Sequence, residues 1–503
     1  MIKIEITSPS QCYIDSITPT ELEVLKRELT FTDTGVMFNL KALKKNHWLQ
    51  QNQPHIYEAR LKELNGKLVT CMLQFDDKAG KYWFRPGSIP YIKERMAVEV
   101  TNLIKYPEPR KIAWRKVLPF DLYPYQHKSV ESLIGAFHAC VEICTGGGKT
   151  AILLTIAREL GLRTVIVTPS KSIFLEVIKK FEYHFGKNNV GAFGNGRKNI
   201  GKRFTVCISK SLTMIKEDTP EYEFFSKTQA LLSDESHLNA ATTLENVFYG
   251  VLKDVPYRFF VSGTQVRGDG KEALLHSIVG EKVFDLTTKE AIAGGYICPV
   301  KFIVFDTTSP DLKNYGDPLK AKRKHFLYNS NIASIAAKIA NSAWSHGGES
   351  TLILVEELCQ IQMIIDKLTV PYGYAHSAAK KDAAKFGLVP TKSEEMVEAF
   401  NKGEIKVLIG TSCISTGTNM YPCHNTVNCV GGASEVRTKQ GAVGRSVRLL
   451  EKSEFKDLHK VKPFSRVYDF NVNNVKRMVD HLDKRIAMYK ETTDDIKYIK
   501  ATT

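Results

Sequence analysis

The sequence predicts an α/β protein with two parallel-sheet domains preceded by a small α+β N-terminal domain. From residue 121 onward, short apolar runs alternate with helical segments, which is typical of parallel strands joined by helical crossovers. The alternation covers about 350 residues. One hydrophobic core rarely exceeds ~250 residues, so two sheets are expected. The strand-like runs are TVIVTPS from 164, QALLSDESH from 229, RFFVSGT from 258, TLILVEE from 351 and KVLIGTS from 406.

Residues 1–95 are predicted to form the N-terminal domain. In TPTELEVLKREL, Thr18, Pro19 and Glu21 form a capping box with proline at the first helical position. The stretch GKLVTCMLQFDDKAGKYWFRP reads as two strands joined by a turn at residues 76–80. A basic linker is expected to follow over 96–120, because KYPEPRKIAWRK mixes prolines with five basic residues.

The two parallel-sheet domains are predicted at 121–297 and 298–470, with a junction in GGYICPVKFIVFDTT. A C-terminal helix is expected within 471–503, because VKRMVDHLDKRIAMYKE is amphipathic. That helix either packs on the second domain or recruits a partner protein, whose identity the sequence does not give.

Positive charge gathers at the two ends of the chain. The formal net charge is +16, with +6 in residues 1–120, +2 in 121–300 and +8 in 301–503. This distribution indicates a polyanion that touches the flanks, and generic solubility is the alternative. Lys41, Lys44 and Lys45 recur at helical spacing, either as a DNA-facing ridge or as a solvated helix face.

The cysteines and the hydropathy pattern exclude several classes of protein. None of the ten cysteines forms a C-x-x-C pair, which argues against a zinc ribbon or a disulfide framework. The N-terminus carries charges where a signal peptide needs an apolar run, and no window reaches the ~18 to 20 apolar residues of a membrane span. A soluble cytoplasmic protein without a membrane partner is therefore expected (in the host cytoplasm, for a phage protein).

The stretch VEICTGGGKT (141–150) has the composition of a phosphate-binding loop. Its three glycines let backbone N–H groups turn toward phosphates, with a helix N-terminus behind them. Lys149 is placed to reach the β- and γ-phosphates of ATP, and Thr150 to hold Mg²⁺. A chance Gly-Lys-Thr in a loop is the alternative, which the strand-like ACVEIC before it and the helical AILLTIAREL after it disfavour.

Two further sequence features complete a nucleotide site. Asp234 and Glu235 follow a buried-type strand, 85 residues after the lysine, where they suit the Mg²⁺ shell and the attacking water. Upstream, Gln126 is suited to bind an adenine edge, and Tyr123 to cover the ring face. Each feature alone is ambiguous, since an Asp-Glu pair is usually a surface turn.

Taken in order, these motifs resemble those of superfamily 2 helicases, in which the phosphate loop often reads Thr-Gly-x-Gly-Lys-Thr. The acidic box Asp-Glu-Ser-His and the Ser-Gly-Thr motif are closer to RecG-, XPB- and UvsW-like DNA remodelling motors than to DEAD-box RNA helicases. The N-terminal ELEVLKRELTFTDTGVMFNLKALKKNHW is similar to the small domain before the motor of phage UvsW-type branch-migration helicases. The matching downstream segments are VTPSKS (167–172), ISKSL (208–212), SGT (262–264), AHSAAK (375–380), GTSCISTGTN (410–419) and VGRSVR (443–448).

The resemblance implies two RecA-like domains with ATP and Mg²⁺ between them. It assigns catalysis to Lys149, Asp234, Glu235, Arg445 and Arg448, with Thr150 and Asp234 holding Mg²⁺. Nucleotide binding falls to Tyr123, Gln126, Thr145, Gly146, Gly147, Gly148, Lys149, Thr150 and Gly417. Coupling falls to His237, Ser262, Thr264 and Gln440, and nucleic-acid binding to Thr168, Ser170, Lys171, Ser209, His376, Thr411 and Thr416.

Some of these assignments have plain alternatives. Arg445 and Arg448, three residues apart on a helix, are arginine fingers or surface charge. Lys171 and His376 also suit local hydrogen bonds. Gln440 lies one residue earlier than the family pattern places its glutamine.

The expected function is an ATP-dependent DNA helicase or translocase that unwinds or branch-migrates forks, junctions, D-loops and R-loops, including RNA–DNA hybrids, in recombination, repair and replication. An RNA helicase and an ATP-gated nucleic-acid clamp with little unwinding are the alternatives.

Overall fold

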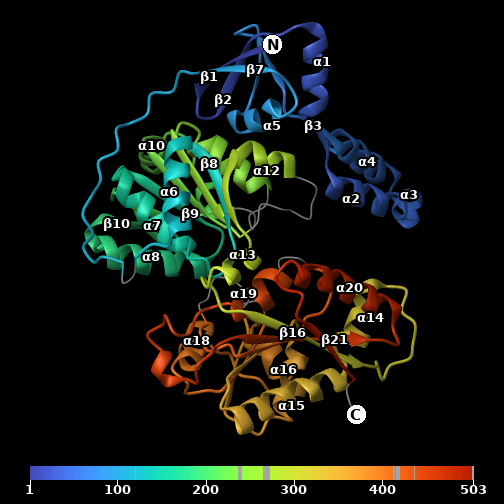
Figure 1. Cartoon of the computed structure of the whole chain (residues 1–503). Coiled ribbons are helices and arrows are strands. Elements are labelled where there is room, and N and C mark those ends of the chain that lie inside the picture. The colour runs from blue at the N-terminus through green and yellow to red at the C-terminus, as the bar shows by residue number, and fades with distance from the viewer. Residues whose placement is uncertain are drawn as a thin grey trace. The chain divides into compact units, whose positions relative to one another are not determined.

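The computed structural model describes residues 1–118, 121–235, 241–263, 272–411, 414, 420–434 and 437–500. Its contacts divide the chain into two compact units (Figure 1). Unit 1 comprises Met1–Ile143 and Gly148–Asp285, and unit 2 comprises Cys144–Gly147 and Leu286–Thr503. The four predicted domain boundaries stay predictions.

The N-terminal part of unit 1 contains a five-stranded sheet and the predicted capped helix. Helix α1 (Pro19–Glu28) begins with the capping box of Thr18 and Glu21, as predicted. The apolar side chains Ile2, Ile4 and Phe84 are buried in the core of this sheet. The sheet has the order β5-β6-β2-β1-β7, from β1 (Ile2–Ser8), β2 (Gln11–Ser16), β5 (Gln74–Asp76), β6 (Lys81–Phe84) and β7 (Val98–Asn102).

A group of three helices interrupts this domain. Strands β3 (Thr30–Thr32) and β4 (Val69–Cys71) pair antiparallel at its base. The predicted turn is confirmed, because β5 and β6 form a hairpin in which Gly80 N donates to Asp76 O at 2.8 Å. The first predicted strand was placed too early, because residues 66–68 still belong to a helix. The three helices are α2 (Thr34–Lys44), α3 (His47–Asn52) and α4 (Pro54–Leu68).

The basic stretch at 105–116 has no regular secondary structure, yet hydrogen bonds hold it against other parts of unit 1. Arg110 N donates to Leu160 O and Arg115 N to His184 O, each at 2.8 Å. The ring of Trp114 stacks on Phe185 with centroids 5.1 Å apart. The segment is thus a strap rather than a free linker.

The large sheet of unit 1 has the order β11-β10-β12-β9-β13-β14-β8-β15. All pairings from β10 to β8 are parallel, and β11 pairs antiparallel with β10. The carboxyl ends of these parallel strands therefore meet at one edge of the sheet. The strands are β8 (His138–Ile143), β9 (Thr164–Thr168), β10 (Val190–Gly194), β11 (Arg197–Asn199), β12 (Phe204–Ile208), β13 (Ala230–Asp234), β14 (Tyr257–Ser262) and β15 (Glu281–Leu286).

Helices cover this sheet because alternate apolar side chains of its strands must be buried on both faces. One face packs with Leu212, Phe225, Leu244 and Leu275, which come from the four helices α9–α12. The other principal helices are α6 (Pro124–Ala136), α7 (Lys149–Leu160) and α8 (Lys171–Phe185), and those of the first group are α9 (Ser209–Leu212), α10 (Pro220–Ser226), α11 (Ala241–Asn246) and α12 (Glu272–Val279).

Unit 2 contains a seven-stranded sheet in the order β18-β19-β17-β20-β21-β16-β22, with every pairing parallel. The predicted C-terminal helix is α20 (Lys476–Lys490), and β22 (Ile496–Lys500) then joins the sheet edge. The other strands are β16 (Val300–Thr307), β17 (Thr351–Leu354), β18 (Tyr372–Ala375), β19 (Val407–Gly410), β20 (Asn425–Asn428) and β21 (Ser465–Val472). The longer helices include α13 (Thr288–Ala293), α15 (Ser330–Gly347), α16 (Leu358–Ile365) and α18 (Ser393–Asn401).

Among the described helices, none combines the length and the apolar character that crossing a membrane requires.

Candidate functional site

The glycine loop connects the end of β8 to the start of α7. Gly148 is the N-cap of α7 and has φ of +74°, and Gly146 has φ of +93°, both in the region that favours glycine. A Cβ at Gly148 would lie 2.4 Å from Nε2 of Gln126. The loop therefore presents backbone N–H groups at a helix N-terminus, as a phosphate site requires.

Lys149, the first residue of α7, points at the acidic pair. Its Nζ forms an ion pair of 2.9 Å with Oε1 of Glu235, and the two side chains are only 11% and 14% exposed. Nζ also donates to Ile143 O at 3.4 Å. The sequence-predicted lysine and glutamate are thus in direct contact.

The acidic pair ends β13 at the carboxyl edge of the sheet. Asp234 is buried, and its Oδ1 has no hydrogen-bond partner among the described residues. Burial, and secondarily the charge of Glu235, raises the pKa of Asp234 to about 7. Glu235 Oε2 accepts hydrogen bonds from Ser262 Oγ at 3.2 Å and from Gly263 N at 3.3 Å, so the predicted coupling residue Ser262 touches the predicted base.

Oxygen donors suited to magnesium lie beside the loop. Mg²⁺ prefers carboxylate, hydroxyl and phosphate oxygens, and a buried carboxylate oxygen without a partner, as in Asp234, fits that preference. The Thr150 hydroxyl accepts a hydrogen bond of 3.4 Å from Lys180, which is paired with Glu176 at 2.6 Å. Sequence reasoning missed Lys180, because a lysine within a helix carries no motif signal.

Gln126 has a structural role that the sequence did not reveal. It is 1% exposed, and its Oε1 accepts a hydrogen bond of 2.9 Å from Tyr123 N, which completes a cap on α6. The rings of Tyr123 and Tyr125 are nearly parallel, with centroids 5.7 Å apart. The predicted contact of Gln126 with adenine stays a prediction.

The predicted nucleic-acid residues of unit 1 lie at the same sheet edge. Thr168 ends β9, but its hydroxyl is buried and donates to Cys207 O at 3.0 Å. Ser170 caps α8, and the exposed Lys171 is the first residue of that helix. Ser209, directly after β12, is 2% exposed. The Thr168 hydroxyl is therefore bonded within the sheet, and the phosphate contacts of these residues stay predictions.

In unit 2 the predicted arginines are enclosed by protein. Arg445 is 3% exposed, and Nε of Arg448 is buried without a hydrogen-bond partner among the described residues. Lys462, which sequence reasoning missed, donates to Tyr421 O at 2.9 Å and to Ser446 O at 3.2 Å. Burial lowers the pKa of the Lys462 ammonium. Lys462 thus secures the backbone beside Arg445.

His376 and Thr411 directly follow strands β18 and β19 of unit 2, and five other predicted residues cannot be placed. His376 is buried and its Nε2 lies 3.2 Å from Val389 O, so it makes the local hydrogen bond that was the alternative reading. Thr411 is buried after β19. His237, Thr264, Thr416, Gly417 and the side chain of Gln440 lie outside the described part of the chain.

Comparison with known proteins finds similar helicase sequences. Residues 119–265 match the family described as Type III restriction enzyme, res subunit. The DNA 3'-5' helicase XPB of Kineococcus radiotolerans is 22% identical over 336 residues, covering 65% of this chain and 57% of that protein. The DNA 3'-5' translocase XPB2 of Sulfurisphaera tokodaii is 24% identical over 370 residues, covering 66% of this chain and 80% of that protein. The aligned region thus spans little more than half the length of the first relative.

Solved structures share the fold. A fragment of a putative HsdR subunit of a type I restriction enzyme from Vibrio vulnificus aligns with 75% of this chain and 68% of that chain, at 14% identity and a TM-score of 0.52. T4 UvsW aligns over 99% of both chains at 15% identity and a TM-score of 0.43. Together the family match and the sequence relatives make this chain similar to superfamily 2 DNA helicases of the XPB type.

Proposed function

We propose that this protein is an ATP-driven DNA translocase that remodels branched DNA. The observation that carries the proposal is the buried cluster at the carboxyl edge of the unit 1 sheet. There Lys149, at the N-terminus of a helix, contacts Glu235 at 2.9 Å, beside a buried Asp234 whose Oδ1 has no partner among the described residues. Such a cluster has the groups needed to bind a nucleotide triphosphate and activate water.

The Lys149–Glu235 ion pair gives this cluster a switch. When ATP phosphates take the ammonium of Lys149, the carboxylate of Glu235 loses this ion pair and is proposed to act as a base for the attacking water. Asp234 and Thr150 would hold Mg²⁺, which neutralises phosphate charge when bound. Arg445 and Arg448 are proposed to stabilise charge that develops on the γ-phosphate.

The helices α2 and α3 are proposed to grip DNA near a branch. Lys41, Lys44 and Lys45 are all exposed there, and the aromatic side chains Phe38 and Trp48 are 65% and 63% exposed. Cations interleaved with exposed aromatic rings suit phosphates and unstacked bases. Replacing the three lysines by alanine should weaken binding to a four-way junction; unchanged affinity would refute this part of the proposal.

For the direction of movement, we propose 3' to 5', by analogy with the two XPB relatives whose names state that polarity. Partial duplexes with a 3' or a 5' single-stranded tail test this directly. Displacement only from the 5'-tailed substrate would contradict it.

The central experiment measures steady-state ATP hydrolysis alone and with single-stranded DNA, linear duplex, a four-way junction or RNA, with Lys149→Ala as the blank. Strongest stimulation by the junction supports the remodelling motor and leads to branch-migration assays. Stimulation by RNA alone would assign the protein to RNA unwinding. Hydrolysis no higher than that of the blank, with nucleic acid still bound, would leave an ATP-gated clamp.

A further inference from the structure

A lysine on α8 lies beside one of the two residues that are proposed to hold Mg²⁺. Lys180 Nζ donates a hydrogen bond of 3.4 Å to Oγ1 of Thr150, the second residue of α7. The lysine comes thirty residues after the threonine, on a different helix, and belongs to no recognised motif. The fold, rather than a sequence pattern, therefore brings this ammonium to the phosphate loop.

The same ammonium is paired with a carboxylate of its own helix. Lys180 Nζ lies 2.6 Å from Oε1 of Glu176, four residues earlier, and the two side chains are 35% and 28% exposed. A glutamate four residues before a lysine is the favourable orientation for such a pair on a helix. Lys180 thus has two acceptors, a neutral hydroxyl on α7 and a charged carboxylate on α8.

The charges of this pair also reach the second proposed magnesium ligand. Burial is the largest cause that raises the pKa of Asp234; after the effects of Glu235 and Lys149, Glu176 raises it further and Lys180 lowers it. The Glu176–Lys180 pair therefore belongs to the electrostatic surroundings of both Thr150 and Asp234.

An ammonium and a metal ion compete for the oxygen of Thr150. A lysine has three donors and no acceptor, so it brings positive charge to that hydroxyl and cannot itself bind a cation. Mg²⁺ needs the lone pair of its ligand oxygen and demands a near-ideal octahedral arrangement. Two positive charges on one neutral oxygen repel each other, so the contact with Lys180 must be given up when the hydroxyl binds a metal.

We infer that Lys180 is a positioning residue that competes with Mg²⁺ for the hydroxyl of Thr150, and that Glu176 retains Lys180 once the hydroxyl binds the metal. Before nucleotide arrives, Lys180 fixes the position of the hydroxyl by its hydrogen bond. The inference rests on the proposed function, which assigns Mg²⁺ to Thr150 and Asp234. It adds control of metal binding by an ion pair on α8 to that proposal.

The test measures the Kd of the full-length protein for a fluorescent, non-hydrolysable ATP analogue, without Mg²⁺ and with saturating Mg²⁺, in the absence of nucleic acid. The ratio of the two Kd values reports how much the metal strengthens nucleotide binding. Lys180→Met keeps the aliphatic stem and removes the competing charge, so the ratio should rise. Glu176→Gln loosens the hold on Lys180, so the ratio should fall.

Each ratio should change about fivefold, since residues outside the ligand shell alter metal affinity by about 10–100-fold and the partial exposure of this pair screens its charge. A loss of folding cannot imitate such a change, because both Kd values come from the same variant. A ratio that stays at the wild-type value in both variants, or that falls in Lys180→Met, overturns the inference.

The double variant separates the proposed competition from a general effect of charge. Because Glu176 acts through Lys180, Glu176→Gln should have no further effect in the Lys180→Met protein, and the double variant should keep the raised ratio of Lys180→Met. Two independent charge effects would instead cancel and return the double variant to the wild-type ratio, which would overturn the inference.

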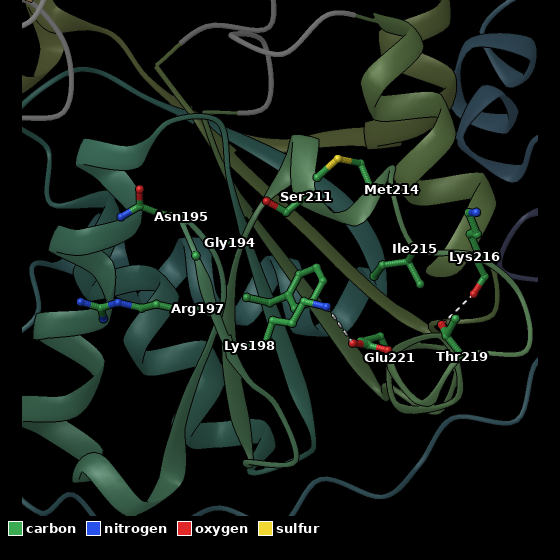
Figure 2. Close-up of a pocket in the computed structure, with 12 residues that line it drawn as sticks. Gly194, Asn195, Arg197, Lys198, Ser211, Met214, Ile215, Lys216, Thr219 and Glu221 are labelled. Carbon is green, nitrogen blue, oxygen red and sulfur yellow. Dashed lines mark hydrogen bonds and ion pairs between the residues drawn. The ribbon is translucent and has the colours of Figure 1, made fainter.

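The matched control is another lysine–glutamate pair of unit 1. Lys198 on β11 lies 3.4 Å from Glu221 on α10 (Figure 2). Strand β11 is six strand intervals from β8, about 28 Å at the usual spacing, well beyond the screening length of about 8 Å in physiological salt. Lys198→Met and Glu221→Gln should therefore leave the ratio unchanged. If the wild-type protein binds the analogue no better with Mg²⁺ than without it, the proposed magnesium site fails rather than the role of Lys180 alone.

Discussion

Replacing Glu235 by glutamine tests the ion pair on which the proposed mechanism depends. The change keeps the shape of the side chain but removes the carboxylate that pairs with Lys149 at 2.9 Å. In the nucleotide-free protein, the ammonium of Lys149 then lacks its ion-pair partner. ATP phosphates should replace that charge, so the variant should gain more stability from ATP than the wild type does.

The magnitude follows from burial. Breaking a fully buried ion pair costs about 3–5 kcal/mol, and exposures of 11% and 14% place this pair somewhat lower, at about 2 kcal/mol. At about 2–4 °C per kcal/mol for a unit of this size, the unfolding temperature without nucleotide should fall by about 4–8 °C. Hydrolysis should slow by about 10²–10⁴-fold if Glu235 is the base.

Differential scanning fluorimetry with and without Mg²⁺–ATP, together with DNA-stimulated ATPase activity, measures both effects. Glu223→Gln is the matched control, because Glu223 pairs with Lys227 at 2.7 Å while both side chains are largely exposed. That control should behave as the wild type. Near-normal hydrolysis by Glu235→Gln, or an unfolding temperature that is unchanged in both conditions, would refute the reasoning.

Three further changes probe other parts of the structure. Gly148→Ala should abolish ATP binding in a fluorescent-nucleotide assay, because φ is +74° and the new Cβ would meet Nε2 of Gln126 at 2.4 Å; retained affinity would contradict the loop geometry. Asp469→Asn should destabilise unit 2 by about 3–5 kcal/mol in urea unfolding, since Arg485 donates two bonds, of 2.7 and 2.9 Å, to this buried carboxylate; a cost below about 1 kcal/mol would argue against the pair. Burial, followed by the charge of Arg258, lowers the pKa of His138 to about 4. Between pH 6.5 and 4 the unfolded chain therefore binds a proton at this histidine that the folded protein does not, and the free energy of unfolding should fall as the pH drops. Unfolding midpoints of His138→Gln should vary less over that range, and an identical pH dependence would assign the effect elsewhere.

The sequence predicted best where local pattern and burial coincide. Strands such as β9 and β13 are buried on both faces, so their apolar runs were unambiguous. The capping box at Thr18 was equally readable, because its signal lies within four residues. The proximity of Lys149 and Glu235 also followed, since parallel strands place their carboxyl ends together.

What the sequence did not predict depends on distant contacts. The sequence alone predicts that Lys462 is exposed, as most lysines are. In the structure its ammonium is buried and donates hydrogen bonds to the carbonyl oxygens of Tyr421 and Ser446. The β10–β11 hairpin was not identified, because its glycine-rich turn carries no periodicity. The position of Gln126 before the phosphate loop suggested a nucleotide contact. The structure shows that its carbonyl oxygen accepts a hydrogen bond from Tyr123 N in the cap of α6.

The attachment of residues 105–116 bears on how force could pass through unit 1. Twelve extended residues span about 40 Å, enough for a long leash. Here the strap is hydrogen-bonded to Leu160, at the far end of the helix that begins at the phosphate loop, and to His184 on α8. These hydrogen bonds hold the segment against α7 and α8, so it cannot extend without breaking them. The segment therefore connects the N-terminal sheet to the last turn of α7, so a change in its path would act directly on the helix that begins at the phosphate loop.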